Sequence, residues 1–169
     1  MTRVDPRAVR ATAGPGLRRV ALVGVPFLWL GMVAAISLFE APLKFQADGV
    51  SREEALAIGQ LVFPALNAVE VVLASAVVVL MWPWRRSARR TWGLALATAG
   101  VLLVQVALVR PILHASTVAV LSGESAGGSS WHLVYVALEG LKIVLLLVLG
   151  YATVGVALGS EPGREPAAG

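Results

Sequence analysis

The chain has 169 residues, of which 57% are hydrophobic, whereas about 45–50% are apolar in an ordinary soluble domain. Its formal net charge is +4, and its arginines gather beside apolar blocks, which indicates membrane topology and requires no nucleic-acid partner. The sequence contains no cysteine, which excludes disulfides, thiolate metal sites and thiol redox chemistry.

Four apolar blocks follow one another along the chain, and each is long enough to cross about 30 Å of hydrocarbon as a helix. They cover residues 20–39, 55–81, 93–113 and 133–158. Because a spanning segment has to satisfy its own backbone hydrogen bonds, we expect an all-α membrane protein built as a four-transmembrane-helix bundle. Residues 18–158 then form the transmembrane domain, and segments 1–17 and 159–169 are expected to be disordered cytoplasmic tails.

The arginines predict the orientation. They precede the first block and fill the joint between the second and third: Arg3, Arg7, Arg10, Arg18 and Arg19, then Arg85, Arg86, Arg89 and Arg90. By the positive-inside rule the chain runs up-down-up-down with both termini cytoplasmic.

Interfacial and capping residues mark the ends of the spans. Trp82, Trp84 and Trp92 are expected at the inner membrane interface, and Trp131 at the outer one. In the first outer joint, Ser51 is expected to cap the second span, with Glu54 completing a capping box.

A carboxylate stands in the middle of the second apolar block. Glu70 lies twelve residues from Trp82, and Lys142 lies eleven from Trp131, which places them about 18 Å and about 16 Å from opposite interfaces and so at nearly the same depth. A lone charge there costs at least ~2.5–3.5 kcal/mol. We therefore expect a Glu70–Lys142 ion pair.

Further polar residues share these helix faces. Asn67 and Glu139 are expected as neighbours of the pair, and Glu139 has Arg110 as an alternative partner. The pair has two interpretations that the sequence leaves open. It either fixes helix packing, as buried pairs can, or it serves in binding or proton handling, as intramembrane ionisable groups commonly do.

A second polar layer lies nearer the outer ends of the spans. It comprises Glu40, Lys44, Arg110, His114 and His132. Beyond the ion pair toward the inside, the second and fourth blocks read "VVLASAVVVL" and "IVLLLVL". The two layers predict a polar cavity that opens to the outside and is closed on the inside by apolar packing.

The sequence offers little support for metal binding or catalysis. His114 and His132, with Glu40 as a hard partner, are candidate metal ligands, but we predict no metal and no cofactor. No catalytic residues are predicted either, because the sequence has no phosphate loop, no H-E-x-x-H and no nucleophile in a suitable context. Trp29 and Gly31 are interpreted as packing residues, with Gly31 permitting close helix approach.

The stretches "WLGMVAAISLFEAPLKF" and "AIGQLVFPALNAVEVVLA" carry a resemblance. Trp29 with Gly31, Pro42 with Phe45, and Phe63 with Asn67 resemble motifs of the DUF4149 and transmembrane protein 205-like families, which are small four-span bacterial proteins. The first span also resembles part of the copper resistance protein D membrane domain. The resemblance implies a multi-pass four-helix bundle in the bacterial cell (inner) membrane, with no established activity.

Three functions remain open from the sequence. The first is a protein that binds or helps to move a small polar solute or ion through the outward pocket. The second is a structural or accessory subunit whose polar helix faces bind a membrane partner. A membrane enzyme or redox subunit ranks last. The expected partners are the lipid bilayer and either a second copy of the chain or a larger membrane protein.

Overall fold

The computed structural model describes residues 6–122 and 130–159, and these are almost entirely helical. The elements in chain order are α1 (Pro6–Ala34), η1 (Ala35–Glu40), α2 (Ala41–Leu43), α3 (Arg52–Met81), η2 (Trp82–Trp84), α4 (Arg89–Val104), η3 (Gln105–Val109), α5 (Arg110–Leu121) and α6 (Ser130–Leu158). Within the described residues there is no strand, and four continuous helices are long and apolar enough to cross a membrane. The expected all-helical protein with four potential spans is confirmed.

The spans are longer than the apolar blocks of the sequence. They run over Gly16–Leu43, Arg52–Trp84, Arg89–Ala115 and Trp131–Leu158. Helix α1 begins at Pro6 and so enters the segment that was expected to be a disordered tail. Pro is favoured in the first helical turn, and the Ala and Arg residues that follow have high helix propensity. The expected carboxyl-terminal tail lies outside the described residues, apart from Gly159.

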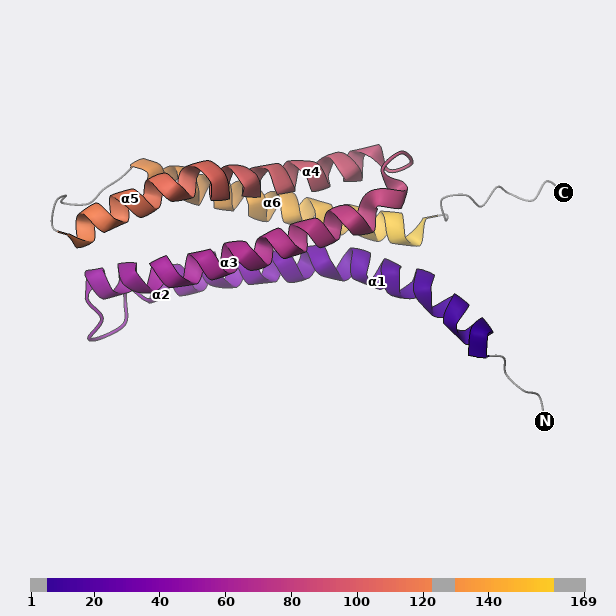
Figure 1. Ribbon diagram of the computed structural model, residues 1–169, viewed down its shortest axis with the longest axis horizontal. Helices are drawn as coiled ribbons and strands as arrows, with labels where there is room; N and C mark the ends of the chain where they lie inside the picture. The colour runs from indigo at the N-terminus through magenta and orange to yellow at the C-terminus, as the bar shows by residue number, and fades with distance from the viewer. Residues whose placement is uncertain (1–5, 123–129, 160–169) are drawn as a thin grey trace.

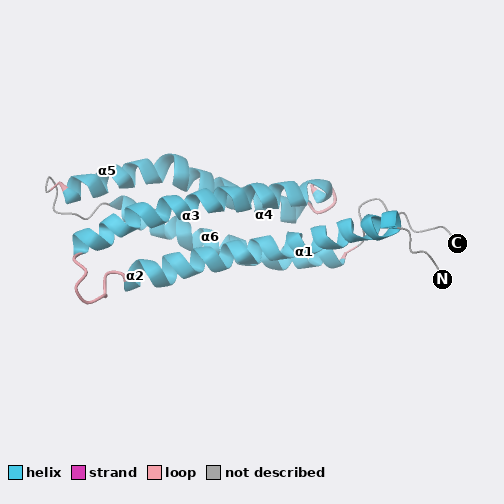
Figure 2. Cartoon of the chain, turned by 60° about the horizontal axis from the view of Figure 1, so that its bottom comes forward, coloured by secondary structure: helices cyan, strands magenta, loops and turns pink. Residues whose placement is uncertain are grey.

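The helices lie side by side along one axis (Figures 1 and 2). Helix α1 packs against α3 and α6, and α4 packs against the same two helices. The loop of residues 44–51 lies at one end of the bundle, hereafter the 44–51 end. The short connection from α3 to α4 lies at the other, hereafter the 82–88 end, where α1 begins and α6 finishes (Figure 1).

The outer surface of the bundle is apolar. Large side chains on every long helix are more than half exposed, among them Leu28, Val72, Leu103 and Leu147. A soluble protein rarely exposes a continuous apolar surface, whereas hydrocarbon chains cover one without cost. The exposed side chains therefore fit a bundle surrounded by lipid.

The start of α3 follows from local sequence. Ser51 caps α3 by accepting a hydrogen bond from the Glu54 backbone N–H at 3.2 Å, while the Glu54 carboxylate accepts one from the Ser51 N–H at 2.8 Å. This confirms the expected capping box.

Trp84 was expected at the membrane interface but is 8% exposed. Because the chain turns inward through η2, its ring packs in the core beneath Arg18, whose guanidinium lies 5.3 Å from the ring centre.

Two described segments are π-helical, and each ends two residues before a proline. Segment η1 precedes Pro42, and η3 precedes Pro111. The N–H groups of Ala41 and Arg110 bond five residues back, to Ile36 and Gln105. A proline ring has no N–H and clashes with the carbonyl four residues earlier in an α-helix. The wider π turn moves that carbonyl aside, so the spans continue through the prolines.

Candidate functional site

A buried ion cluster lies at mid-length between α3 and α6. We use this name for Glu70, Glu139 and Lys142. The Lys142 Nζ lies 2.6 Å from Glu70 Oε1 and 2.7 Å from Glu139 Oε2. The side chains of Glu70 and Lys142 are fully buried, and that of Glu139 is 6% exposed. The expected Glu70–Lys142 ion pair is therefore present, and Glu139 pairs with the same lysine instead of with Arg110.

Neutral side chains surround the ion cluster, and all but Tyr135 come from elements other than α3 and α6. The Trp29 indole N–H donates to Glu70 Oε1 at 2.9 Å. The Tyr135 and Ser37 hydroxyls donate to Glu139 Oε1 at 3.2 and 3.3 Å. Lys142 donates to Gln105 Oε1 at 3.0 Å. Trp29 was expected to serve packing alone; it is buried in the core and also holds the carboxylate.

The π turns supply two of these partners. Ser37 belongs to η1 and Gln105 to η3, so each turn presents one polar side chain to the ion cluster. Neither residue is among those predicted from the sequence. Gln105 carried a usable signal, because it is a polar residue thirteen positions from Trp92 inside an apolar block, at about the depth of Glu70.

Several polar atoms beside the ion cluster lack hydrogen-bond partners. Asn67 is 2% exposed, and neither atom of its amide is bonded. Glu70 Oε2 and Gln105 Nε2 are also buried without a partner. Asn67 lies one helical turn from Glu70, as its spacing predicted. Most buried polar groups in proteins are bonded, so this concentration indicates a site that handles polar species.

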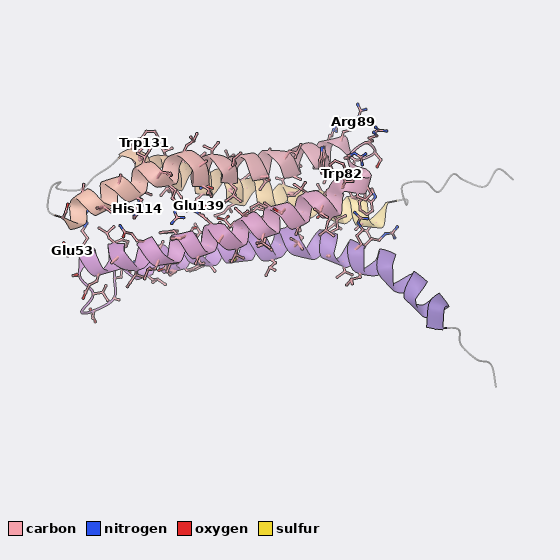
Figure 3. The ribbon with its side chains drawn as sticks, in the orientation of Figure 1. Glu53, Trp82, Arg89, His114, Trp131 and Glu139 are labelled. Carbon is pink, nitrogen blue, oxygen red and sulfur yellow. The ribbon has the colours of Figure 1, made fainter. Side chains whose placement is uncertain are left out.

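A cavity of about 620 Å³ lies between the ion cluster and the 44–51 end. Residues of η1, α2, α3, α5 and α6 form its wall. Glu139 reaches the cavity, whereas Glu70 and Lys142 are not part of its lining. Figure 3 shows His114 and Glu139 between the ribbons, on the side of Glu53 and away from Trp82 and Arg89. Glu139 therefore connects the cavity to the ion cluster.

The wall of the cavity is apolar with basic groups set into it. Its apolar part includes Leu38, Phe45, Leu56, Phe63, Leu113 and Val136. Four of the five residues of the second polar layer also line it: Lys44, Arg110, His114 and His132. The second polar layer of the sequence is thus brought together. Glu40 is not in the lining; it lies behind Lys44, with 3.4 Å between their charged atoms.

Close packing holds Lys44 in place. Its Nζ lies 4.9 Å from the centre of the Phe63 ring, and Phe63 makes an edge-on contact with Tyr135. A Cβ added to Gly59 would stand 3.1 Å from the same Nζ. The absence of a side chain at Gly59 therefore leaves room for the ammonium group.

The expectation for Gly31 was wrong. Gly31 is exposed, and a Cβ added there would contact nothing within 4 Å. The close approach occurs at Gly150 on α6, where an added Cβ would lie 2.9 Å from the Phe27 ring of α1. The apolar pattern could not separate these positions, because both glycines lie in uniformly apolar runs.

Toward the 82–88 end the interior is closed. Its core is a cluster of apolar side chains that includes Leu22, Val77, Met81, Leu102, Leu146 and Leu149. Arg18 covers this end by donating to the carbonyls of Val79 and Leu80 and by lying over Trp84. The described residues contain no group of three or more His, Asp or Glu side chains that could hold a metal ion.

No family model matches the chain, and neither a curated protein nor a solved structure is significantly similar to it. The resemblance to the DUF4149 and transmembrane protein 205-like families therefore stays a prediction.

Proposed function

We propose that this chain is a multi-pass protein of a bacterial cell membrane, arranged up-down-up-down with both termini cytoplasmic. Arg18 and the arginine-bearing connection of residues 85–90 lie at the 82–88 end. The positive-inside rule assigns that end to the cytoplasm. The 44–51 end and its cavity then face the outside.

In this orientation the cavity binds a small solute that carries an acidic group beside an apolar body, and the protein serves to hold or help move that solute. The apolar wall supplies surface for the body of the ligand. The basic groups of the wall supply partners for an anion. Ligand pockets in proteins commonly combine a mostly apolar lining with a few placed polar groups.

Arg110 is the observation that carries this proposal. It lines the cavity, and among the described residues it forms no ion pair. Lys44, by contrast, has Glu40, and Lys142 has the carboxylates of the ion cluster. A guanidinium at membrane depth calls for an anionic partner, and its planar fork suits a carboxylate. An acidic ligand would supply that partner.

The test compares octanoate with octanol, which share the alkyl chain and differ in the charged group. Thermal unfolding of the protein in lipid nanodiscs is followed with each compound. We expect octanoate to stabilise the protein more than octanol does. Hydrogen bonds to charged groups contribute about 1.5–3 kcal/mol, so Arg110→Gln is expected to weaken octanoate binding about 10- to 100-fold.

Arg52→Gln is the matched control, because Arg52 is exposed at the start of α3 and does not line the cavity. It is expected to leave the octanoate response unchanged. Equal responses to the two compounds, or an octanoate response that Arg110→Gln does not alter, would refute the acidic-ligand assignment.

The accessory-subunit function remains the alternative. It requires polar helix faces that are available to a partner's helices. In this bundle the polar faces of α3 and α6 meet each other in the ion cluster, whose three charged side chains contact one another within one chain. That arrangement favours the binding function. Recovery of the protein with a stoichiometric larger membrane protein in mild detergent would favour the accessory function.

A further inference from the structure

The ion cluster contains more acid than base. Glu70 and Glu139 contact the single ammonium group of Lys142, and no other cation forms an ion pair with them in the described parts of the chain. The remaining contacts come from Trp29, Ser37, Tyr135 and Gln105, which are neutral donors or acceptors. With both carboxyls ionised, the ion cluster would carry one uncompensated negative charge.

An uncompensated charge is energetically unfavourable at this buried position. All three side chains are at most 6% exposed, and the effective cost of removing one ion from water is several kcal/mol even after the protein relaxes. Groups in this situation are commonly neutralised by binding a proton. We propose that the ion cluster holds one exchangeable proton between Glu70 and Glu139, in addition to those of the lysine, and that Glu139 exchanges it with the cavity.

The contacts assign a resting position to this proton. Glu139 accepts from Ser37 and Tyr135 on Oε1 and contacts Lys142 through Oε2, so each of its oxygens has a polar contact. Glu70 accepts from Trp29 and Lys142 on Oε1, and its Oε2 has no partner. The free oxygen of Glu70 carries the proton at rest.

Lys142 connects the two carboxyls. Its Nζ lies within 2.7 Å of an oxygen of each. If Lys142 passes one of its protons to Glu139, and the Glu70 carboxyl then rotates its protonated oxygen toward Lys142 and returns a proton, the lysine regains its charge and the proton has moved to the cavity side. Release from Glu139 to the cavity then leaves both carboxyls ionised, and uptake reverses the sequence. Proton number and charge balance at each step.

Other ionisable groups lie around this route. Tyr135 contacts Glu139 directly from α6, and Arg110, His114 and His132 line the cavity that Glu139 reaches. Lys44 lines the same cavity and is paired with Glu40. The cations in this wall attract negative charge to the cavity. The unbonded amide of Asn67 beside Glu70 is an independent indication that the site handles polar species.

Infrared spectroscopy of the protein in nanodiscs at neutral pH, without added ligand, tests the proposal. A protonated carboxyl gives a stretching band that shifts in heavy water. We expect the band in the unaltered protein and expect it to shift after transfer to heavy water. Either Glu70→Gln or Glu139→Gln is expected to abolish it, because one remaining carboxylate then balances Lys142. Glu53→Gln, at an exposed carboxyl, is the control and retains the band.

Three results would overturn the proposal. The first is the lack of a protonated-carboxyl band in the unaltered protein. The second is a full band in Glu139→Gln, which would show that Glu70 binds its proton independently. The third is a band that does not shift after hours in heavy water, since no exchange with the cavity would then occur. None of these results depends on octanoate binding, so this proposal and the acidic-ligand function fail separately.

Discussion

The half of the bundle toward the 44–51 end and the half toward the 82–88 end bury polar groups in different ways. In the first, polar side chains bond across helices, as Trp29, Gln105 and Ser37 do in contacting the ion cluster. In the second, the buried Thr98 and Thr153 donate to carbonyls of their own helices, Leu94 and Gly150. The second half is therefore held together mainly by apolar packing.

This difference separates two sources of stability. Apolar packing depends on volume, has little directional preference and closes the space between helices. The ion cluster depends on specific contacts from helices α1, α3, α6 and the two π turns. It leaves polar atoms unbonded and stands next to a cavity. We therefore expect function in the half toward the 44–51 end and rigidity in the half toward the 82–88 end.

Lys142→Met should have the largest effect, because it leaves Glu70 and Glu139 buried without a cation. Breaking a buried ion pair by removing one partner costs about 3–5 kcal/mol. The free energy of unfolding in detergent micelles measures the loss. Lys44→Met is the comparison, since its partner Glu40 is 32% exposed and such pairs contribute about 0–1 kcal/mol. Similar losses in the two variants would contradict the distinction between buried and peripheral charge.

Leu146→Ala tests the packed half. Leu146 is fully buried, and truncating such a residue costs about 2–5 kcal/mol. The same unfolding measurement is expected to show this loss, while the affinity for octanoate stays unchanged. Leu147 is adjacent but 56% exposed on the outer surface, so Leu147→Ala is expected to cost much less. A large loss of octanoate affinity in Leu146→Ala would show that the two halves are not separable.

Ser37→Ala removes one hydrogen bond to Glu139 from the π turn. A typical bond of this kind contributes about 0.5–1.5 kcal/mol to the free energy of unfolding. Ser75→Ala is the control, because the Ser75 hydroxyl is exposed and bonds the Val71 carbonyl of its own helix. Equal stabilities of the two variants would indicate that the contact of Ser37 with the ion cluster adds nothing to the fold.

Gly59→Ala should have the smallest effect on stability and a selective effect on the cavity. Alanine favours an α-helix over glycine by about 0.8–1.0 kcal/mol, but the new methyl group displaces the Lys44 ammonium. The net change in unfolding free energy is expected to be near zero, with weaker octanoate binding. Gly31→Ala meets open space and is expected to raise stability and leave binding unaltered. Identical binding in the two variants would remove Lys44 from the site.

The sequence predicted those features that depend on periodicity and depth. The four apolar blocks indicated the spans, and matched depth and facing indicated the contact of Glu70 with Lys142. The sequence did not predict that Glu139 also pairs with Lys142, although it placed Glu139 near the Glu70–Lys142 pair. At a spacing of three residues, Glu139 and Lys142 share a helix face, so this pairing was available to the same reasoning.

The contacts of Ser37 and Gln105 were harder to predict. They depend on the π turns, which change which side chains share a face, and the apolar pattern around them reads as an ordinary α-helix. Pro42 and Pro111 were the local cause, but Pro64 lies inside α3 without a π turn, so a proline alone does not specify one. Packing from neighbouring helices decides between these outcomes.

The π turns also make the angular positions of the two ends of a span independent. Converting η1 or η3 to α-helical geometry with the same number of residues would rotate the rest of the span by about 100° about its axis, which is the angular step of one residue. Lys44 beyond η1, or His114 beyond η3, would then leave the cavity wall. The residues before each turn, including Trp29 and Leu102, would keep their orientation. Interconversion of π and α geometry at these turns thus offers a route by which related chains could acquire a different ligand while preserving one buried scaffold.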